Sequence, residues 1–120
     1  MKPTLIDIQE QLEAFARERE WNNYHSPKNI AMALSVEAAE LLEIFQWKTE
    51  EESAELNEKD HEAARHEIAD VFLYLLTISR VLNIDILQAA QDKLRLNAQK
   101  YPVAKSKGNA LKYDELDKQP

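Results

Sequence analysis

The sequence predicts an all-α fold in which four helices form one bundle-like protomer. Glycine occurs once and proline only at positions 3, 27, 102 and 120, so the long apolar stretches contain no helix breaker. Apolar residues in these stretches recur at helical spacing, and no segment alternates in the way a half-buried strand does. With 120 residues, 44% of them apolar, the chain has the size and composition of one domain.

The first two helices have recognisable starts. An amphipathic helix is expected over residues 5–20, because apolar side chains recur on one face and charged side chains occupy the other. Ser26 and Pro27 are typical of an N-cap and a first helical position, and they predict a second helix over 28–47. The start of this second helix is the clearest boundary in the sequence.

An acidic connection, residues 49–57, separates the second helix from the third. The third helix is expected over 60–82, and the asparagine that follows, Asn83, is a plausible stop. Asp85, with a glutamine three residues later, resembles a capping box and predicts a fourth helix over 86–100.

Charge is unevenly distributed along the chain. The formal net charge of −7 argues against stable nucleic-acid binding. Residues 50–70 hold nine acidic side chains against two basic ones, whereas residues 93–112 hold six basic side chains and no acidic one. Two solvated faces of opposite sign explain this pattern, and so does a cation site that faces a polyanion site. We expect a single domain over 1–101 and a basic, irregular and mobile tail over 102–120.

Cysteine is absent, so the chain offers neither a disulfide nor a thiolate ligand. This composition fits a reducing compartment, and we expect a cytoplasmic protein. Charges interrupt every long apolar run, so neither a signal peptide nor a membrane span is expected. The second and third helices are apolar almost all round, which predicts a homo-oligomer, a dimer or a tetramer, that buries the excess surface.

Two pairs of acidic residues lie inside the most apolar stretches. Glu37 and Glu40 fall in the second helix, and Glu67 and Asp70 fall in the third. The i, i+3 spacing projects each pair from one helix face, where an unpaired buried carboxylate is costly or becomes neutral. Four oxygen ligands without nitrogen or sulfur suit Mg²⁺ or Mn²⁺. Salt bridges to neighbouring helices, or exposure to water at a seam, are the alternative.

A hydrated cation held by carboxylates usually acts on phosphate-bearing substrates. The expected chemistry is hydrolysis at phosphorus by a water that the metal or a carboxylate activates, with Glu37 or Glu40 as the candidate catalytic base. Because no Walker loop is present, substrate binding is expected to depend on the metal and on side chains.

Aromatic residues accompany the acidic pairs. Trp47 and Tyr74 follow the two pairs by one or two helical turns, and Trp21 precedes the second helix. Such residues stack on nucleobases in some sites and pack in the core in others, and both readings remain open. His25 is either a hydrogen-bonding residue at the helix entry or a contact for a base edge.

These residues, taken together, resemble a known enzyme family. The chain is similar to the all-α nucleoside triphosphate pyrophosphohydrolases, and more narrowly to the dCTP pyrophosphatase branch of the MazG-like superfamily. The resemblance runs from about Leu5 to Leu116. It includes both acidic pairs, Phe15–Trp21, His25–Asn29, Phe45–Lys48, Leu73–Leu76, Lys93 with Asn97, Lys100–Pro102 and Lys105–Gly108.

The resemblance implies Mg²⁺-dependent hydrolysis of dCTP, or of a related or modified nucleoside triphosphate, to the monophosphate and pyrophosphate, in nucleotide-pool housekeeping. It implies a domain over 1–101 that carries the catalytic site and a tail over 102–120 that contributes to phosphate binding. Members of the family form tight dimers and tetramers of dimers.

The resemblance also implies a role for each candidate residue. Glu37, Glu40, Glu67 and Asp70 would hold the metal, while Trp21, Trp47 and Tyr74 would line the base pocket. Asn97 would approach the sugar or a phosphate, and the triphosphate would be engaged, partly from a neighbouring subunit, by Lys93, Lys100, Tyr101 and Lys105. Two alternatives remain open: a non-catalytic helical interaction module with a structural cation, and the same fold acting on dUTP or phosphoribosyl-ATP.

Overall fold

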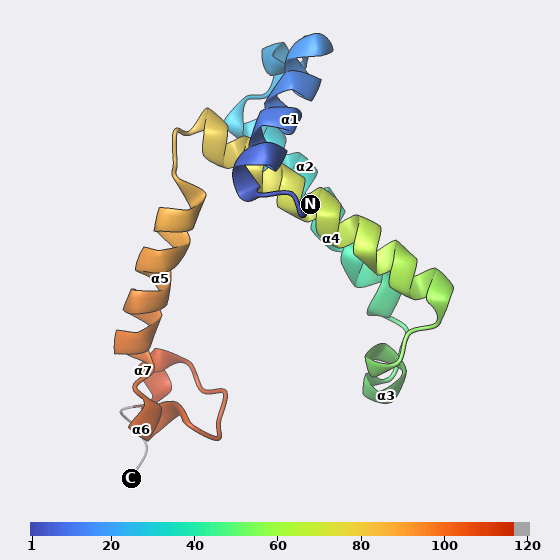
Figure 1. Ribbon diagram of the computed structural model, residues 1–120. Helices are drawn as coiled ribbons and strands as arrows, with labels where there is room; N and C mark the ends of the chain where they lie inside the picture. Colours follow the sequence, from blue (N-terminus) through green and yellow to red (C-terminus); the bar gives the residue numbers. More distant parts are fainter. Residues whose placement is uncertain (117–120) are drawn as a thin grey trace. The chain divides into compact units, whose positions relative to one another are not determined.

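The computed structural model describes residues 1–116, and every regular element in this part of the chain is helical (Figure 1). The all-α prediction is therefore confirmed. The elements are α1 (Leu5–Glu18), the 3-10 helix η1 (Trp21–Tyr24), α2 (Pro27–Phe45), α3 (Glu50–Ala54), α4 (Glu58–Val81), α5 (Ile86–Lys100), α6 (Val103–Ser106) and α7 (Tyr113–Leu116).

The capping residues explain where the long helices begin and end. The Ser26 hydroxyl accepts the Asn29 N–H, with Pro27 at the first position of α2, as the sequence predicts. Asn83, just past α4, takes a left-handed conformation with φ of 56° and stops the helix. Asp85 caps α5 by accepting the Gln88 N–H.

Some predicted boundaries need correction. The first helix ends at Glu18 rather than at 20, because Glu20 adopts a left-handed conformation with φ of 55° that α-helix cannot continue through. The second helix ends at Phe45 rather than at 47. The tail is not wholly irregular, because α6 and α7 form short helical turns within it. Residues 117–120 of the predicted tail lie outside the described part of the chain.

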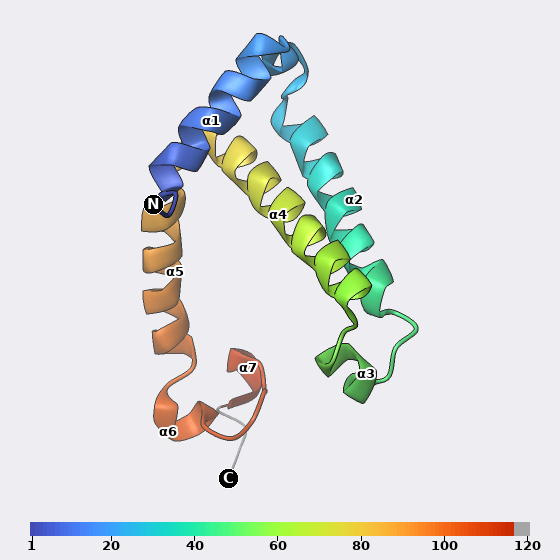
Figure 2. The same ribbon diagram turned by 45° about the vertical axis from the view of Figure 1, so that its right-hand side comes forward.

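The chain divides into two compact units, Met1–Ile84 and Asp85–Pro120. In the first unit α2 and α4 lie side by side and antiparallel, joined through α3, and α1 packs on α4 (Figures 1 and 2). The second unit holds α5, α6 and α7. The packing of a fourth helix on the first three, and the single domain expected over 1–101, stay predictions.

The first unit has a small core and a large apolar surface. Its buried apolar side chains are Ala16, Ile30, Ala64 and Leu76. Large side chains of α2 and α4 remain exposed, among them Val36 with 55%, Ile68 with 57% and Phe72 with 40% of its surface accessible. None of the described helices is both long and apolar enough to cross a bilayer.

Candidate metal centre and aromatic pocket

The antiparallel pairing of α2 and α4 brings the two acidic pairs together. Glu37 on α2 and Glu67 and Asp70 on α4 each place one carboxylate oxygen within 4.8 Å of the others. Glu40, one turn after Glu37 on α2, interacts with both glutamates of this set. We call these four residues the acidic cluster. The sequence placed each pair on one helix face, and the helix pairing turns both faces toward each other.

Two oxygen atoms of the acidic cluster are buried without a hydrogen-bond partner in the described structure, Oε2 of Glu37 and Oε2 of Glu67. The pKa of Glu37 is raised to about 7, mainly by burial and in addition by the neighbouring carboxyl groups of Glu40, Glu67 and Asp70. Burial, together with Glu40 and Asp70, also raises the pKa of Glu67. The negative charges therefore oppose one another unless a cation or a proton neutralises them.

Salt bridges within the first unit engage other acids. Lys48 Nζ lies 2.8 Å from Asp60, and Arg65 Nη1 lies 2.9 Å from Glu62. Neither of these ion pairs includes a member of the acidic cluster. The first pair joins the segment after α2 to the first turn of α4, and the second lies within α4.

The donor set of the acidic cluster fits a hard divalent cation. All its ligand atoms are carboxylate oxygens, converging from two helices, which is the chemistry that Mg²⁺ and Mn²⁺ prefer. The unpartnered buried oxygens of Glu37 and Glu67 are the observation that a bound cation would explain.

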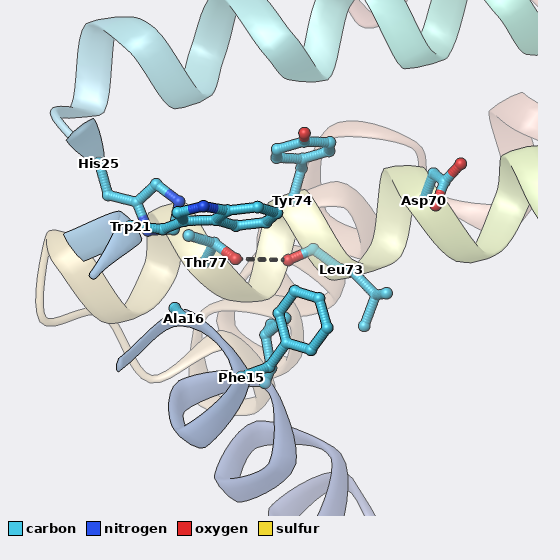
Figure 3. Close-up of a pocket in the computed structure, with 9 residues that line it drawn as sticks. Phe15, Ala16, Trp21, His25, Asp70, Leu73, Tyr74 and Thr77 are labelled. Carbon is cyan, nitrogen blue, oxygen red and sulfur yellow. Dashed lines mark hydrogen bonds between the residues drawn. The ribbon is translucent and has the colours of Figure 1, made fainter. Parts of the chain in front are cut away.

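A pocket of about 240 Å³ adjoins the acidic cluster, and Asp70 belongs to both (Figure 3). It brings together three of the predicted substrate-binding residues, Trp21, His25 and Tyr74. The pocket is smaller than the usual range of about 300 to 1,000 Å³ for drug-sized ligands, so it fits a flat ring rather than a whole nucleotide. Its lining residues are Leu12, Phe15, Ala16, Trp21, His25, Asp70, Leu73, Tyr74 and Thr77.

The turn between α1 and η1 holds Trp21 in place. The left-handed residue Glu20 redirects the chain, so that Trp21 returns toward α1. There its indole meets Phe15 edge to face, with ring centroids 5.4 Å apart and planes at 74°. The Arg19 guanidinium stacks 3.6 Å from the centroid of the Phe15 ring, on which it forms a cation–π contact.

His25 contributes a buried nitrogen to the pocket. Its Nδ1 has no hydrogen-bond partner among the described residues. Burial and, to a smaller extent, the positive charge of Arg80 lower the pKa of His25, so that its imidazole is neutral near pH 7. Arg80 itself is held by Asn22, whose side-chain oxygen accepts its N–H at 3.3 Å.

Several pocket residues were missed by the sequence reasoning. Thr77 is the most informative of them, because it is polar and buried, and its hydroxyl donates a hydrogen bond to the Leu73 carbonyl at 2.8 Å. Its spacing in the sequence could have revealed it, because Thr77 lies three residues after Tyr74 and seven after Asp70 and therefore on the same face of α4. Leu12, Phe15 and Leu73 complete the apolar walls.

The remaining predicted residues lie elsewhere in the chain. Trp47 lies in the connection between α2 and α3, with 89% of its surface exposed, and it does not line the pocket. The spacing of Lys93, Asn97 and Lys100 places them on one face of α5, in the second unit. Tyr101 caps this helix and Lys105 lies on α6. The predicted substrate contacts of these residues stay predictions.

Comparison with known proteins gives a consistent result. The sequence model of the MazG-like family matches residues 32–116. The chain is 39% identical to dCTP pyrophosphatase 1 of Mus musculus and 35% identical to that of Homo sapiens, in each case over 117 residues that make up 96% of this chain and 69% of the relative. A crystal structure of a pyrophosphatase from Archaeoglobus fulgidus superposes with a TM-score of 0.78 at 39% identity, and the match covers 85% of this chain and 95% of that one. The resemblance drawn from the motifs is confirmed.

Proposed function

The chain belongs to the MazG-like family, and from this premise we propose that it is a nucleoside triphosphate pyrophosphohydrolase. Its substrate is dCTP or a related or modified deoxynucleoside triphosphate, which it converts to the monophosphate and pyrophosphate in nucleotide-pool housekeeping. The observation that carries the proposal is the acidic cluster with its unpartnered buried oxygens, directly beside an aromatic pocket. The names of the relatives support the choice of dCTP.

Glu37, Glu40, Glu67 and Asp70 are the residues that would hold the cation, Mg²⁺ or Mn²⁺. When bound, a hard divalent cation neutralises charge on the phosphate oxygens and lowers the pKa of a coordinated water. Asp70 belongs both to the acidic cluster and to the pocket lining, so the proposed sites for the phosphates and for the base adjoin each other. A base in the pocket therefore has its phosphates directed toward the cluster.

Glu37 and Glu40 are the candidates for the general base. Either carboxylate takes a proton from the attacking water, whose oxygen bonds to the α or β phosphorus as the anhydride P–O bond breaks. In the protein without a cation, burial among other carboxyl groups raises the pKa of Glu37 to about 7. A cation bound to the acidic cluster would lower this pKa again and keep the carboxylate ionised and able to accept a proton.

Trp21 and Tyr74 provide the stacking surfaces for the base, and His25 reaches its edge. Trp47, Asn97 and the triphosphate contacts Lys93, Lys100, Tyr101 and Lys105 complete the proposed site. Part of this set comes from a neighbouring subunit.

The exposed apolar side chains of α2 and α4 support a homo-oligomer, either a dimer or a tetramer of dimers. A folded unit that buries few large apolar residues gains stability when a second copy covers the rest. The net charge of −7 supports the absence of stable nucleic-acid binding. Cytoplasmic localisation stays a prediction from composition.

A substrate screen tests the proposed function. The protein is incubated with Mg²⁺ and each common ribo- and deoxynucleoside triphosphate, and also with phosphoribosyl-ATP, and the release of pyrophosphate and monophosphate is followed. We expect dCTP to rank first. A non-catalytic interaction module with a structural cation would hydrolyse none of them, and preference for dUTP or phosphoribosyl-ATP would keep the enzyme but change its substrate.

A further inference from the structure

We propose that the hydroxyl of Thr77 selects for a base that carries an exocyclic amino group, such as cytosine, over a base with a carbonyl at the same position, such as uracil. The inference rests on the proposed function, because it concerns the pocket that we propose as the site of the base. It adds a specificity-determining residue on α4 that the motifs did not reveal.

The hydrogen bond of Thr77 determines what its oxygen can still do. A hydroxyl has one proton to donate and two lone pairs that accept. The Thr77 proton is directed to the Leu73 carbonyl at 2.8 Å. While this bond is kept, the oxygen presents only its lone pairs to a molecule in the pocket, and donating to that molecule would break the bond to Leu73.

Thr77 makes a hydrogen bond that is common in helices, but its side chain also lines the pocket and can contact a bound molecule. Ser79 on the same helix makes the same kind of bond, to the Leu75 carbonyl at 2.7 Å, and is buried to a similar degree. Only Thr77 of these two residues lines the pocket. Its side chain is drawn with those of the other lining residues in the close-up, one helical turn beyond Tyr74 (Figure 3).

A ring stacked on the aromatic residues would present its edge to Thr77. The walls formed by Leu12, Phe15 and Leu73 offer no side-chain donor or acceptor, so the polar atoms at this end are few. One is the Thr77 oxygen, and another is the buried and unpartnered Nδ1 of His25. Two polar atoms in an apolar wall are enough to orient one edge of a small ring.

An amino group and a carbonyl interact differently with this edge. The exocyclic amino group of cytosine has two N–H donors, one of which pairs with the Thr77 oxygen. The carbonyl oxygen of uracil or thymine at the same position would point its lone pairs at those of the Thr77 oxygen. Both oxygens would lose their hydration without gaining a hydrogen-bond donor. Sites built to pair with a polar substrate group reject analogues for this reason.

The test compares Thr77→Val, which removes the hydroxyl and keeps the branched shape, with Thr77→Ser, which keeps the hydroxyl. The ratio of kcat/KM for dCTP to that for dUTP is measured for each with Mg²⁺. We expect the ratio to fall about tenfold in Thr77→Val, the loss of one buried hydrogen bond, and to stay near the wild-type value in Thr77→Ser. An unchanged ratio in a folded Thr77→Val protein would overturn the proposal.

Ser79→Ala is the matched control, because it removes another buried hydroxyl with the same kind of hydrogen bond from α4, outside the pocket. Its ratio should equal that of the wild type, and a fall as large as in Thr77→Val would refute a direct contact. If Thr77→Val does not fold, as judged by circular dichroism, the wild-type protein still decides: equal kcat/KM for dCTP and dUTP excludes selection by Thr77.

Binding of nucleosides separates this inference from the proposed function. Calorimetry with deoxycytidine and deoxyuridine requires no metal and no hydrolysis. If the wild type cleaves no triphosphate but binds deoxycytidine more tightly, and Thr77→Val removes the difference, the function is wrong and the inference stands. If the wild type hydrolyses dCTP but binds deoxycytidine and deoxyuridine equally, the proposed function stands and the inference is wrong.

Discussion

Glu37 on α2 and Glu67 on α4 each bury one carboxylate oxygen without a hydrogen-bond partner, and both residues belong to one cluster of acidic groups. Thirty residues separate them in the sequence. Like charges held together in this way weaken the fold unless they are neutralised, and proteins retain such arrangements mainly where they have a use. The following predictions depend on this arrangement and on the pocket beside it.

The acidic cluster should make the stability of the metal-free protein depend on pH. Because the pKa of Glu37 is raised from 4.5 to about 7, the folded state binds more protons than the unfolded state between these values. The stability that protonated Glu37 gives to the folded state is fully present below pH 4.5. It is lost as the pH rises through the folded-state pKa of about 7. We expect Tm in EDTA to fall from pH 5 to pH 8, and Mg²⁺ to restore it at pH 8.

The variant Glu37→Gln isolates this effect, since it removes the titrating group and keeps the shape of the side chain. At pH 8 without metal it should unfold a few degrees above the wild type, and at pH 5 the difference should be much smaller. Thermal unfolding followed by circular dichroism measures both. A wild-type Tm that rises relative to that of the variant between pH 5 and pH 8 would contradict the raised pKa.

Glu37→Gln should also abolish most of the turnover. Loss of a general base typically costs about 10²- to 10⁴-fold in rate, and loss of a metal ligand adds to this. Calorimetry should show weaker Mg²⁺ binding for Asp70→Asn and Glu67→Gln as well. Glu43→Gln on α2 is the control, because Glu43 is exposed and outside the cluster, and near-normal activity of Glu37→Gln would remove the cluster from the mechanism.

Trp21→Ala should raise KM for the preferred substrate. Stacking of a base on an aromatic side chain contributes about 1 to 3 kcal/mol, which corresponds to about 5- to 150-fold. Tyr24→Ala provides the comparison, since Tyr24 belongs to the same 3-10 helix but does not line the pocket. Steady-state kinetics on both variants decides, and equal KM values for Trp21→Ala and wild type would place the base elsewhere.

Phe72→Arg should disrupt self-association. Phe72 lies with Ile68 on the exposed side of α4, and a charge there cannot be buried against a second copy. We expect light scattering to report a dimer or a larger assembly for the wild type and a smaller species for the variant. Glu13→Arg, on an exposed position of α1, is the control for a change of charge. A wild type that is monomeric and active at nanomolar concentration would contradict the predicted self-association.

Ser26→Ala should destabilise the fold by about 1 kcal/mol, within the range of about 0.5 to 2 kcal/mol for lost N-caps. The Ser26 hydroxyl satisfies the Asn29 N–H at the start of α2. Ser35→Ala removes a hydroxyl from the middle of the same helix, where it only bonds the Met32 carbonyl, and should be neutral or stabilising. Urea unfolding with a shared m-value measures both.

Local interactions made much of the fold predictable. Caps such as Ser26 and stops such as Asn83 act within one turn of backbone, so the sequence alone indicates where α2 begins and α4 ends. The left-handed turn at Glu20 escaped prediction, because a non-glycine residue in that conformation is uncommon and carries no clear sequence signal. This turn creates η1 and thereby positions Trp21.

The sequence by itself determined that Glu37 and Glu40, and Glu67 and Asp70, form two pairs on two apolar helices, because helical spacing is a local property. Only the tertiary structure decided that the pairs converge, since convergence depends on the antiparallel packing of α2 on α4. It likewise decided that Trp21 and His25 meet Tyr74 around a pocket from which Trp47 is absent, and that Thr77 belongs there. Long-range packing determines these neighbours. A local sequence pattern does not reveal them, because packing depends on the fit between whole helix faces and not on any single residue.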